Sequence, residues 1–290
     1  MNQKISVIGG DARQIKVANA LSDHGYSVLL TGFCEDKVFD KSIKIENDVQ
    51  KAVEFADIII LPLPVSFDDV FLNTPLYDKQ IDVCELMKLV PKNQLLLTGM
   101  ISKKLKTLCS VYGIYDMDYF TREEMKILNA IPTAEGAIEI AMREMPITIH
   151  NSRTLVLGYG HVGKVVAEKL KGIGAKVTVS ARKCADLATI RAYGYDGIKT
   201  EDVAKYIGEF DVIFNSIPAK ILDREVLQHV NKHSIIIDLA SKPGGVDFDV
   251  AKELNKKVIW ALSLPGKVAP ITAGEIIADT ILNIIEELGV

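Results

Sequence analysis

The chain has 290 residues, of which 48% are hydrophobic and 25% charged, and its formal net charge is −4. This length suits two domains or one large domain, and the composition is that of a soluble globular protein, which excludes a disordered or fibrous chain. A mildly acidic chain without a block of Lys or Arg is not expected to bind nucleic acid or an anionic membrane.

The apolar runs are short. The run that starts at Ile58 ends at Pro62, far below the roughly 20 residues that span a bilayer. The apolar stretch near the N-terminus is too short for the apolar region of a signal peptide. The four cysteines, which show no Cys-x-x-Cys spacing, are expected to be reduced thiols and not a disulfide framework or a zinc site. We therefore expect a cytoplasmic protein.

Short β-rich runs alternate with longer amphipathic stretches along the whole chain. In the first half the expected strands are residues 5–8, 26–31, 57–63, 94–98 and 113–116. In the second half they are residues 154–157, 176–180, 211–215, 234–239 and 257–261. Continuous aliphatic runs suit strands that are buried on both faces. The alternation predicts βαβ units with a parallel sheet in each half.

The two halves also resemble each other in sequence. Val7-Ile8-Gly9 matches Val156-Leu157-Gly158, and later matches follow in the same order. Such an ordered series indicates one strand–helix architecture used twice. The predicted fold class is therefore α/β, with two Rossmann-like, doubly wound, parallel-sheet domains.

The predicted domain boundaries follow from this repeat. Residues 1–128, together with a C-terminal helix at about 273–290, form the first Rossmann-like domain. Residues 129–152 form an interdomain helix, and residues 153–265 form the second Rossmann domain. Around the junction we expect two helical stretches, 125–130 and 133–145, with Pro132 opening the second, and a turn at 264–267. A cleft is expected between the domains.

A glycine-rich loop in the second half is the sharpest motif. It has the G-x-G-x-x-G spacing, follows a predicted strand and opens a predicted helix, which is the setting of a dinucleotide-binding loop. The helix start has free N–H groups that favour a pyrophosphate. The cofactor-binding residues expected here are Gly158, Tyr159, Gly160, His161, Val162 and Gly163.

The end of the next strand indicates which dinucleotide binds. An NAD site usually places Asp or Glu there for the ribose 2′-OH, whereas this chain has Ser180, Arg182 and Lys183, which can donate to a 2′-phosphate. These residues favour NADP over NAD; the alternative is a solvated basic turn. Residues 153–265 are therefore the expected NADP-binding domain, and the first domain is the expected substrate domain. Further along, Asn215 and Ser216 are expected on the nicotinamide side, in a loop shaped by Pro218.

Candidate substrate-binding residues lie mainly in or beside the first domain. They are Arg13, Ser66, Thr98, Thr133 and Lys267. Arg13 follows a glycine turn at a helix start and is a candidate carboxylate anchor, as is Lys267. The alternatives are structural: a surface arginine, a helix N-cap at Thr133, and a solvated lysine. The sequence reveals no general base, so the catalytic residues stay unknown, and no metal site is expected.

Four segments together carry a family resemblance: residues 7–14, 129–137, 158–163 and 264–270. Over essentially its whole length the chain resembles the dipicolinate synthase A-subunit family of spore-forming bacteria. The resemblance implies NADP-dependent oxidation of dihydrodipicolinate, or of its hydrated precursor, to dipicolinate in the mother cell during sporulation. It also implies that the dipicolinate synthase B-subunit, which is flavoprotein-like, is the partner of an oligomeric chain.

Two other functions stay open at this point. The chain could be a dehydratase that acts on the hydroxylated tetrahydrodipicolinate precursor, or an NADP-binding regulatory subunit. Dehydration alone would leave the absorbance of NADPH unchanged.

Overall fold

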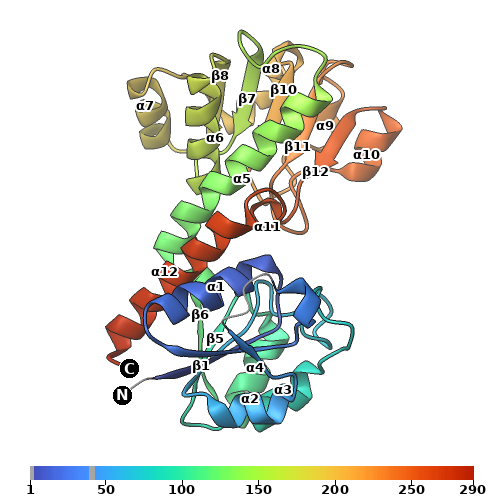
Figure 1. Ribbon diagram of the computed structural model, residues 1–290. Helices are drawn as coiled ribbons and strands as arrows, with labels where there is room; N and C mark the ends of the chain where they lie inside the picture. The colour runs from blue at the N-terminus through green and yellow to red at the C-terminus, as the bar shows by residue number, and fades with distance from the viewer. Residues whose placement is uncertain (1–2, 39–42) are drawn as a thin grey trace. The chain divides into compact units, whose positions relative to one another are not determined.

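The computed structural model describes residues 3–38 and 43–290, so Met1 and Asn2 at the N-terminus lie outside the described residues. The chain divides into two compact units (Figure 1). Unit 1 is Met1–Leu128 with Ala269–Val290, and unit 2 is Asn129–Val268. The division falls within one long helix, α5 (Glu123–Glu144).

Unit 1 contains, over its described residues, a six-stranded parallel sheet in the order β3-β2-β1-β4-β5-β6. Its strands are β1 (Lys4–Ile8), β2 (Ser27–Thr31), β3 (Lys44–Ile45), β4 (Ile58–Ile60), β5 (Leu95–Thr98) and β6 (Tyr115–Asp118). Its helices, besides the start of α5, are α1 (Ala12–Asp23), α2 (Val49–Phe55), α3 (Val83–Leu89), α4 (Lys103–Tyr112) and α12 (Pro270–Leu288).

Helices cover both faces of this sheet because its strands are apolar on both sides. Helices α1 and α12 lie side by side on one face, and α2, α3 and α4 lie on the other (Figure 1). Helix α1 begins directly after the first strand because Asp11 and Gln14 form a capping box there. That cap fixes the turn in which Arg13 sits.

Unit 2 repeats this architecture with a sheet in the order β12-β11-β10-β7-β8-β9, again parallel throughout. Its strands are β7 (Arg153–Leu157), β8 (Lys176–Ala181), β9 (Asp196–Lys199), β10 (Val212–Asn215), β11 (Ile235–Asp238) and β12 (Lys257–Trp260). Its helices, besides the rest of α5, are α6 (His161–Gly172), α7 (Cys184–Ala192), α8 (Val203–Tyr206), α9 (Arg224–Leu227), α10 (Phe248–Glu253) and α11 (Leu264–Val268).

Two apolar cores hold unit 2 together. Helices α5, α6 and α7 pack on one face of the sheet, while α8, α9 and α10 pack on the other (Figure 1). Both sheets have the strand order of a doubly wound dinucleotide-binding fold, with the order reversing beside the first strand of each unit. The predicted fold class, two Rossmann-like parallel-sheet domains, is confirmed.

Some local predictions are wrong. Residues 123–144 form one continuous helix with Pro132 inside it, not two stretches that Pro132 separates. The predicted turn at 264–267 is the short helix α11. Strands β3 and β9 have no counterpart in the predicted set; both are short edge strands with polar residues, so they lack the apolar run that marks a central strand. Among the described residues, no helix combines the length and apolar character needed to cross a membrane.

The packing of α12 against α1 generates a first prediction. A Cβ at Gly274 of α12 would lie 2.7 Å from the Arg13 carbonyl oxygen and 2.7 Å from Lys16 Cβ. We expect Gly274→Ala to lower the free energy of unfolding by about 1–2 kcal/mol, because overpacking outweighs the better helix propensity of Ala. Urea unfolding followed by circular dichroism measures this change.

The control is Gly172→Ala at the end of α6, where a Cβ would meet no atom within 4 Å. That variant should be as stable as the wild type, or more stable by up to about 1 kcal/mol. Equal stability of the two variants would contradict the close α1–α12 contact.

Candidate functional site

The glycine-rich loop of unit 2 connects β7 to α6 at the carboxyl edge of the sheet. Gly158 has a φ of +94°, a conformation that a side chain rarely adopts, and its N–H donates to the Ser180 carbonyl oxygen at 3.1 Å. Gly160 is the N-cap of α6 and makes no side-chain cap bond. The start of α6 therefore has no side-chain cap and points its backbone N–H groups toward the place where an anion can bind.

Gly160 and Gly163 face opposite surroundings in this loop. A Cβ at Gly160 would meet no atom within 4 Å, so the space above it is open to a ligand. A Cβ at Gly163 would overlap the Gly158 carbonyl oxygen, so this glycine lets α6 pack directly against the loop. The other predicted loop residues, Tyr159, His161 and Val162, are half-buried.

Tyr159 packs beside α6. Lys164 Nζ lies 5.3 Å from the centre of its ring, and burial, with a smaller contribution from Tyr195, raises the pKa of the Tyr159 hydroxyl. The phenol therefore stays neutral. Its ring borders one side of the loop and makes a cation–π contact with Lys164.

Exposed cations follow strand β8, at the place that selects between dinucleotides. Arg182 and Lys183 are exposed and make no ion pair with the described residues. Ser180 is different: its side chain is fully buried, and its Oγ lies 3.4 Å from the Gly158 nitrogen. It therefore supports the loop from beneath, and its contact with a 2′-phosphate stays a prediction.

The loops after β10 and β11 are held by a buried carboxylate. Asp238 is fully buried; its Oδ1 accepts from Asn215 Nδ2 at 2.8 Å and from the Ala240 N–H at 3.2 Å, and its Oδ2 accepts from the Gly245 N–H at 2.9 Å. The Asn215 amide also bonds both ways with Ile217. Asn215 thus links the two loops, and its place beside the nicotinamide stays a prediction.

Asp238 is a residue that sequence reasoning missed. A carboxylate at the end of an apolar strand was the available signal. Ser216 Oγ donates to the Leu157 carbonyl oxygen at 2.9 Å and touches the Gly158 turn, while Pro218 is exposed in the same loop. Ser216 therefore also shapes the phosphate loop.

In unit 1, Arg13 is already engaged. Its side chain is 8% exposed, and Nε and Nη2 bond the Asp11 carboxylate at 2.9 and 2.8 Å, with Nη2 also donating to the Leu63 carbonyl oxygen. Among the described residues, Nη1 has no hydrogen-bond partner. A carboxylate ligand would have to share this guanidinium with Asp11.

Three predicted hydroxyl groups are occupied by local structure. Ser66 Oγ donates to the Phe71 carbonyl oxygen at 2.6 Å and accepts from the Asp69 N–H at 3.0 Å, so it closes a turn. Thr98 is fully buried at the end of β5. Thr133 lies inside α5, where its Oγ1 donates to the Asn129 carbonyl oxygen at 2.7 Å, so it is not an N-cap. Their contact with the substrate stays a prediction.

Lys267 is exposed in the last turn of α11 and forms no ion pair within the part of the chain that the structure describes. Over residues 3–38 and 43–290, no group of three or more His, Cys, Asp or Glu side chains is placed to bind a metal ion.

Two family models match the chain, one in each unit. Residues 4–120 match the N-terminal domain of the dipicolinate synthase A-subunit, and residues 129–264 match the NAD-binding domain of D-isomer specific 2-hydroxyacid dehydrogenases. The dipicolinate synthase A-subunit from Bacillus subtilis (strain 168) is 32% identical over 287 residues, which is 98% of this chain and 96% of that protein. The chain belongs to the dipicolinate synthase A-subunit family.

Solved structures agree with this assignment. The dipicolinate synthase A-subunit from Bacillus halodurans superposes with a TM-score of 0.92 at 32% identity, covering 98% of both chains. The A chain of dipicolinate synthase from Bacillus subtilis superposes with a TM-score of 0.91 at 31% identity, covering 100% of this chain and 97% of that one. Unit 2 is thus a nicotinamide-dinucleotide-binding domain, and the open loop at Gly160 fits that cofactor.

The contrast between the two loop glycines is testable. We expect Gly160→Ala to weaken dinucleotide binding more than tenfold without changing the melting temperature, because the methyl group fills only ligand space. Gly163→Ala should lower the melting temperature, because its Cβ overlaps a backbone oxygen. Fluorescence titration with NADPH and thermal melting measure the two effects, and unchanged binding by Gly160→Ala would place the pyrophosphate elsewhere.

Proposed function

We propose that the chain is an NADP-dependent oxidoreductase that converts dihydrodipicolinate, or its hydrated precursor, to dipicolinate during sporulation. The observation that carries this proposal is the end of β8, where a dinucleotide loop is followed by Ala181, Arg182 and Lys183 with no carboxylate. A carboxylate at this place would accept from the 2′-OH of NAD, whereas exposed cations favour the 2′-phosphate of NADP. Family membership supplies the substrate class.

When bound, NADP⁺ supplies a hydride acceptor. Oxidation of a dihydropyridine dicarboxylate removes one hydride and one proton, and the ring becomes aromatic. Aromatisation favours the products, so the reaction does not require a strong protein base. This is consistent with the lack of a predicted general base. The α6 N-terminus would hold the pyrophosphate, and Arg182 with Lys183 would hold the 2′-phosphate.

Two cations are proposed to bind the substrate carboxylates. Lys267 is exposed and unpaired among the described residues, so its ammonium group is free for a carboxylate. The Asp11 carboxylate bonds Nε and Nη2 of Arg13 and so orients its guanidinium group. Nη1 of Arg13 is then available to a substrate carboxylate. Ser66, Thr98 and Thr133 are also proposed to bind the substrate, although their hydroxyl groups bond the chain itself.

The remaining parts of the proposal concern the setting. We propose that the chain acts in the cytoplasm of the mother cell, and that it works with the flavoprotein-like B-subunit of dipicolinate synthase. The Bacillus subtilis relative is named as one subunit of a synthase, which supports a complex.

Arg182 gives a direct test of cofactor choice. A charged hydrogen bond contributes about 1.5–3 kcal/mol. We therefore expect Arg182→Ala to weaken NADPH binding about ten- to a hundredfold and to leave NADH binding nearly unchanged. Titration of both cofactors measures this difference, with Arg191→Ala, an exposed arginine at the other end of α7, as the matched control. Equal losses for NADPH and NADH would contradict the assignment.

Cys184 provides a second readout that needs no activity. This exposed thiol begins α7, directly after Arg182 and Lys183. NADP⁺ should slow its reaction with a thiol reagent, and NAD⁺ at the same concentration should protect it less. Burial raises the pKa of Cys109 to about 11, so that thiol should react only after unfolding.

The reaction itself is tested with the purified chain, alone and with its partner protein. We expect NADPH absorbance to rise together with dipicolinate, and Lys267→Ala to raise KM for the dicarboxylate about tenfold with an unchanged melting temperature, as loss of one charged hydrogen bond implies. Lys252→Ala, an exposed lysine in α10, is the control. Dipicolinate formed without any NADPH signal would instead support the dehydratase function.

A further inference from the structure

Asp238 holds a negative charge inside unit 2. Among the described residues it is the only Asp or Glu that is fully buried. Its partners are the Asn215 amide and the N–H groups of Ala240 and Gly245, all of them neutral donors, so the carboxylate only accepts. Over residues 3–38 and 43–290 no Lys or Arg forms an ion pair with it, and Lys242 in the same loop is exposed to solvent. The charge of Asp238 is therefore not neutralised by a neighbour.

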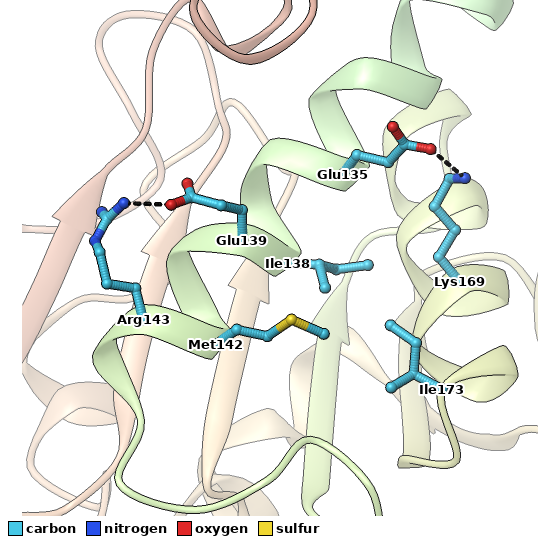
Figure 2. A pocket seen from close by; sticks show the side chains of 7 residues that line it. All are labelled: Glu135, Ile138, Glu139, Met142, Arg143, Lys169 and Ile173. Carbon is cyan, nitrogen blue, oxygen red and sulfur yellow. Dashed lines mark hydrogen bonds and ion pairs between the residues drawn. The ribbon is translucent and has the colours of Figure 1, made fainter.

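The surface of the same unit offers a contrast. Figure 2 shows two ion pairs beside the open pocket between α5 and α6, Glu135 with Lys169 and Glu139 with Arg143. Each of these carboxylates has a cation beside it, and solvent screens both pairs. Burying a carboxylate without a cation is unfavourable even when its oxygens are bonded. The charge of Asp238 therefore needs a role beyond linking two loops.

Asp238 lies at the sheet edge where the nicotinamide end of a dinucleotide is expected. A doubly wound sheet binds a dinucleotide across the point where its strand order reverses, which is here between β7 and β10. The proposed 2′-phosphate site follows β8, on one side of that point. The other end of the cofactor then extends over the carboxyl ends of β10 and β11, whose last residues are Asn215 and Asp238.

The loops after these two strands hold the carboxylate in place. The Gly245 carbonyl oxygen accepts from the Ile221 and Leu222 N–H groups at 3.2 and 3.0 Å, so the loop after β11 is bonded to the loop after β10. A Cβ at Gly245 would overlap the Asn215 amide, which shows how closely the two loops pack. The Asp238 charge therefore stays at one place at the carboxyl edge of the sheet.

The two redox forms of the cofactor differ in charge at this end. Oxidation of the dihydropyridine removes two electrons as a hydride and releases one proton. The hydride changes the nicotinamide ring from a cation in NADP⁺ to a neutral ring in NADPH, while the adenosine, the pyrophosphate and the 2′-phosphate stay the same. A fixed negative charge near the ring therefore attracts the oxidised form more strongly than the reduced form.

We propose that Asp238 determines which redox form of the cofactor binds better, because its buried and uncompensated charge favours NADP⁺ over NADPH. A unit charge that acts over about 10 Å at an effective dielectric constant of about 20 changes a binding constant roughly tenfold. This direction suits the proposed reaction, which consumes NADP⁺ and releases NADPH. The inference rests on the proposed binding of NADP and is independent of the substrate.

The test compares the dissociation constants of NADP⁺ and NADPH for the full chain, measured by isothermal titration calorimetry. D238N removes the charge and keeps the shape of the side chain. We expect it to raise the dissociation constant of NADP⁺ about tenfold more than that of NADPH. The fragment 2′,5′-ADP lacks the nicotinamide, so it should bind D238N and the wild type alike, which also shows that the variant is folded.

Three control variants separate the charge from the hydrogen bonds. N215A breaks the link between the loops and keeps the carboxylate, so it should weaken both forms by the same factor. The double variant N215D with D238N keeps one carboxylate in the buried pair and should retain the wild-type ratio of the two dissociation constants. D249N removes an exposed carboxylate of α10, where solvent screens the charge, and should leave both constants unchanged.

Equal effects of D238N on NADP⁺ and NADPH would overturn the inference, because a merely structural role weakens both forms alike. A selective loss of NADP⁺ in N215A or in the double variant would also overturn it, since both keep a buried carboxylate. These two variants test the inference even where D238N does not fold. A wild type that binds neither form would instead contradict the proposed cofactor, and this inference with it.

Discussion

The dinucleotide-binding unit depends on one close approach between α6 and the loop before it. Gly163 lies so near the Gly158 carbonyl oxygen that no Cβ fits between them, and Gly158 itself adopts a positive φ. This contact aims the start of α6 at the open space above Gly160. The N–H groups of the first helical turn, the helix dipole and the missing side chain then combine at one point, where a pyrophosphate can bind.

A second constraint surrounds this loop. The buried carboxylate of Asp238 holds Asn215 and the Gly245 backbone, and Asn215 in turn fixes Ile217. Burying a charged group is unfavourable unless its oxygens are bonded, and here the donors come from two loops. Removing the carboxylate would leave buried donors without a partner, so the same group that ties the loops together also keeps them in one arrangement.

Much of the fold was predictable because its signals are local. Runs such as Ile58–Ile60 and Ile235–Asp238 mark buried strands by composition alone, and the glycine spacing at 158–163 marks the turn between a strand and a helix. The short edge strands β3 and β9 carry no such run. Pro132 is a helix breaker in most settings, yet here it lies within α5, between the buried Ala130 and Ala134.

The sequence by itself determined the fold class, the place of the dinucleotide loop and the basic residues that follow β8, because each depends on neighbours along the chain. Only the tertiary structure decided what the individual polar side chains do. Ser180 lies beneath the loop, Asn215 bonds Asp238, and Ser66 closes a turn, since in each case the choice between a ligand and the protein is made by the groups that surround the side chain. The sequence is the same whether a hydroxyl or amide side chain faces solvent or a buried partner. Its burial in the folded chain decides which of the two it bonds.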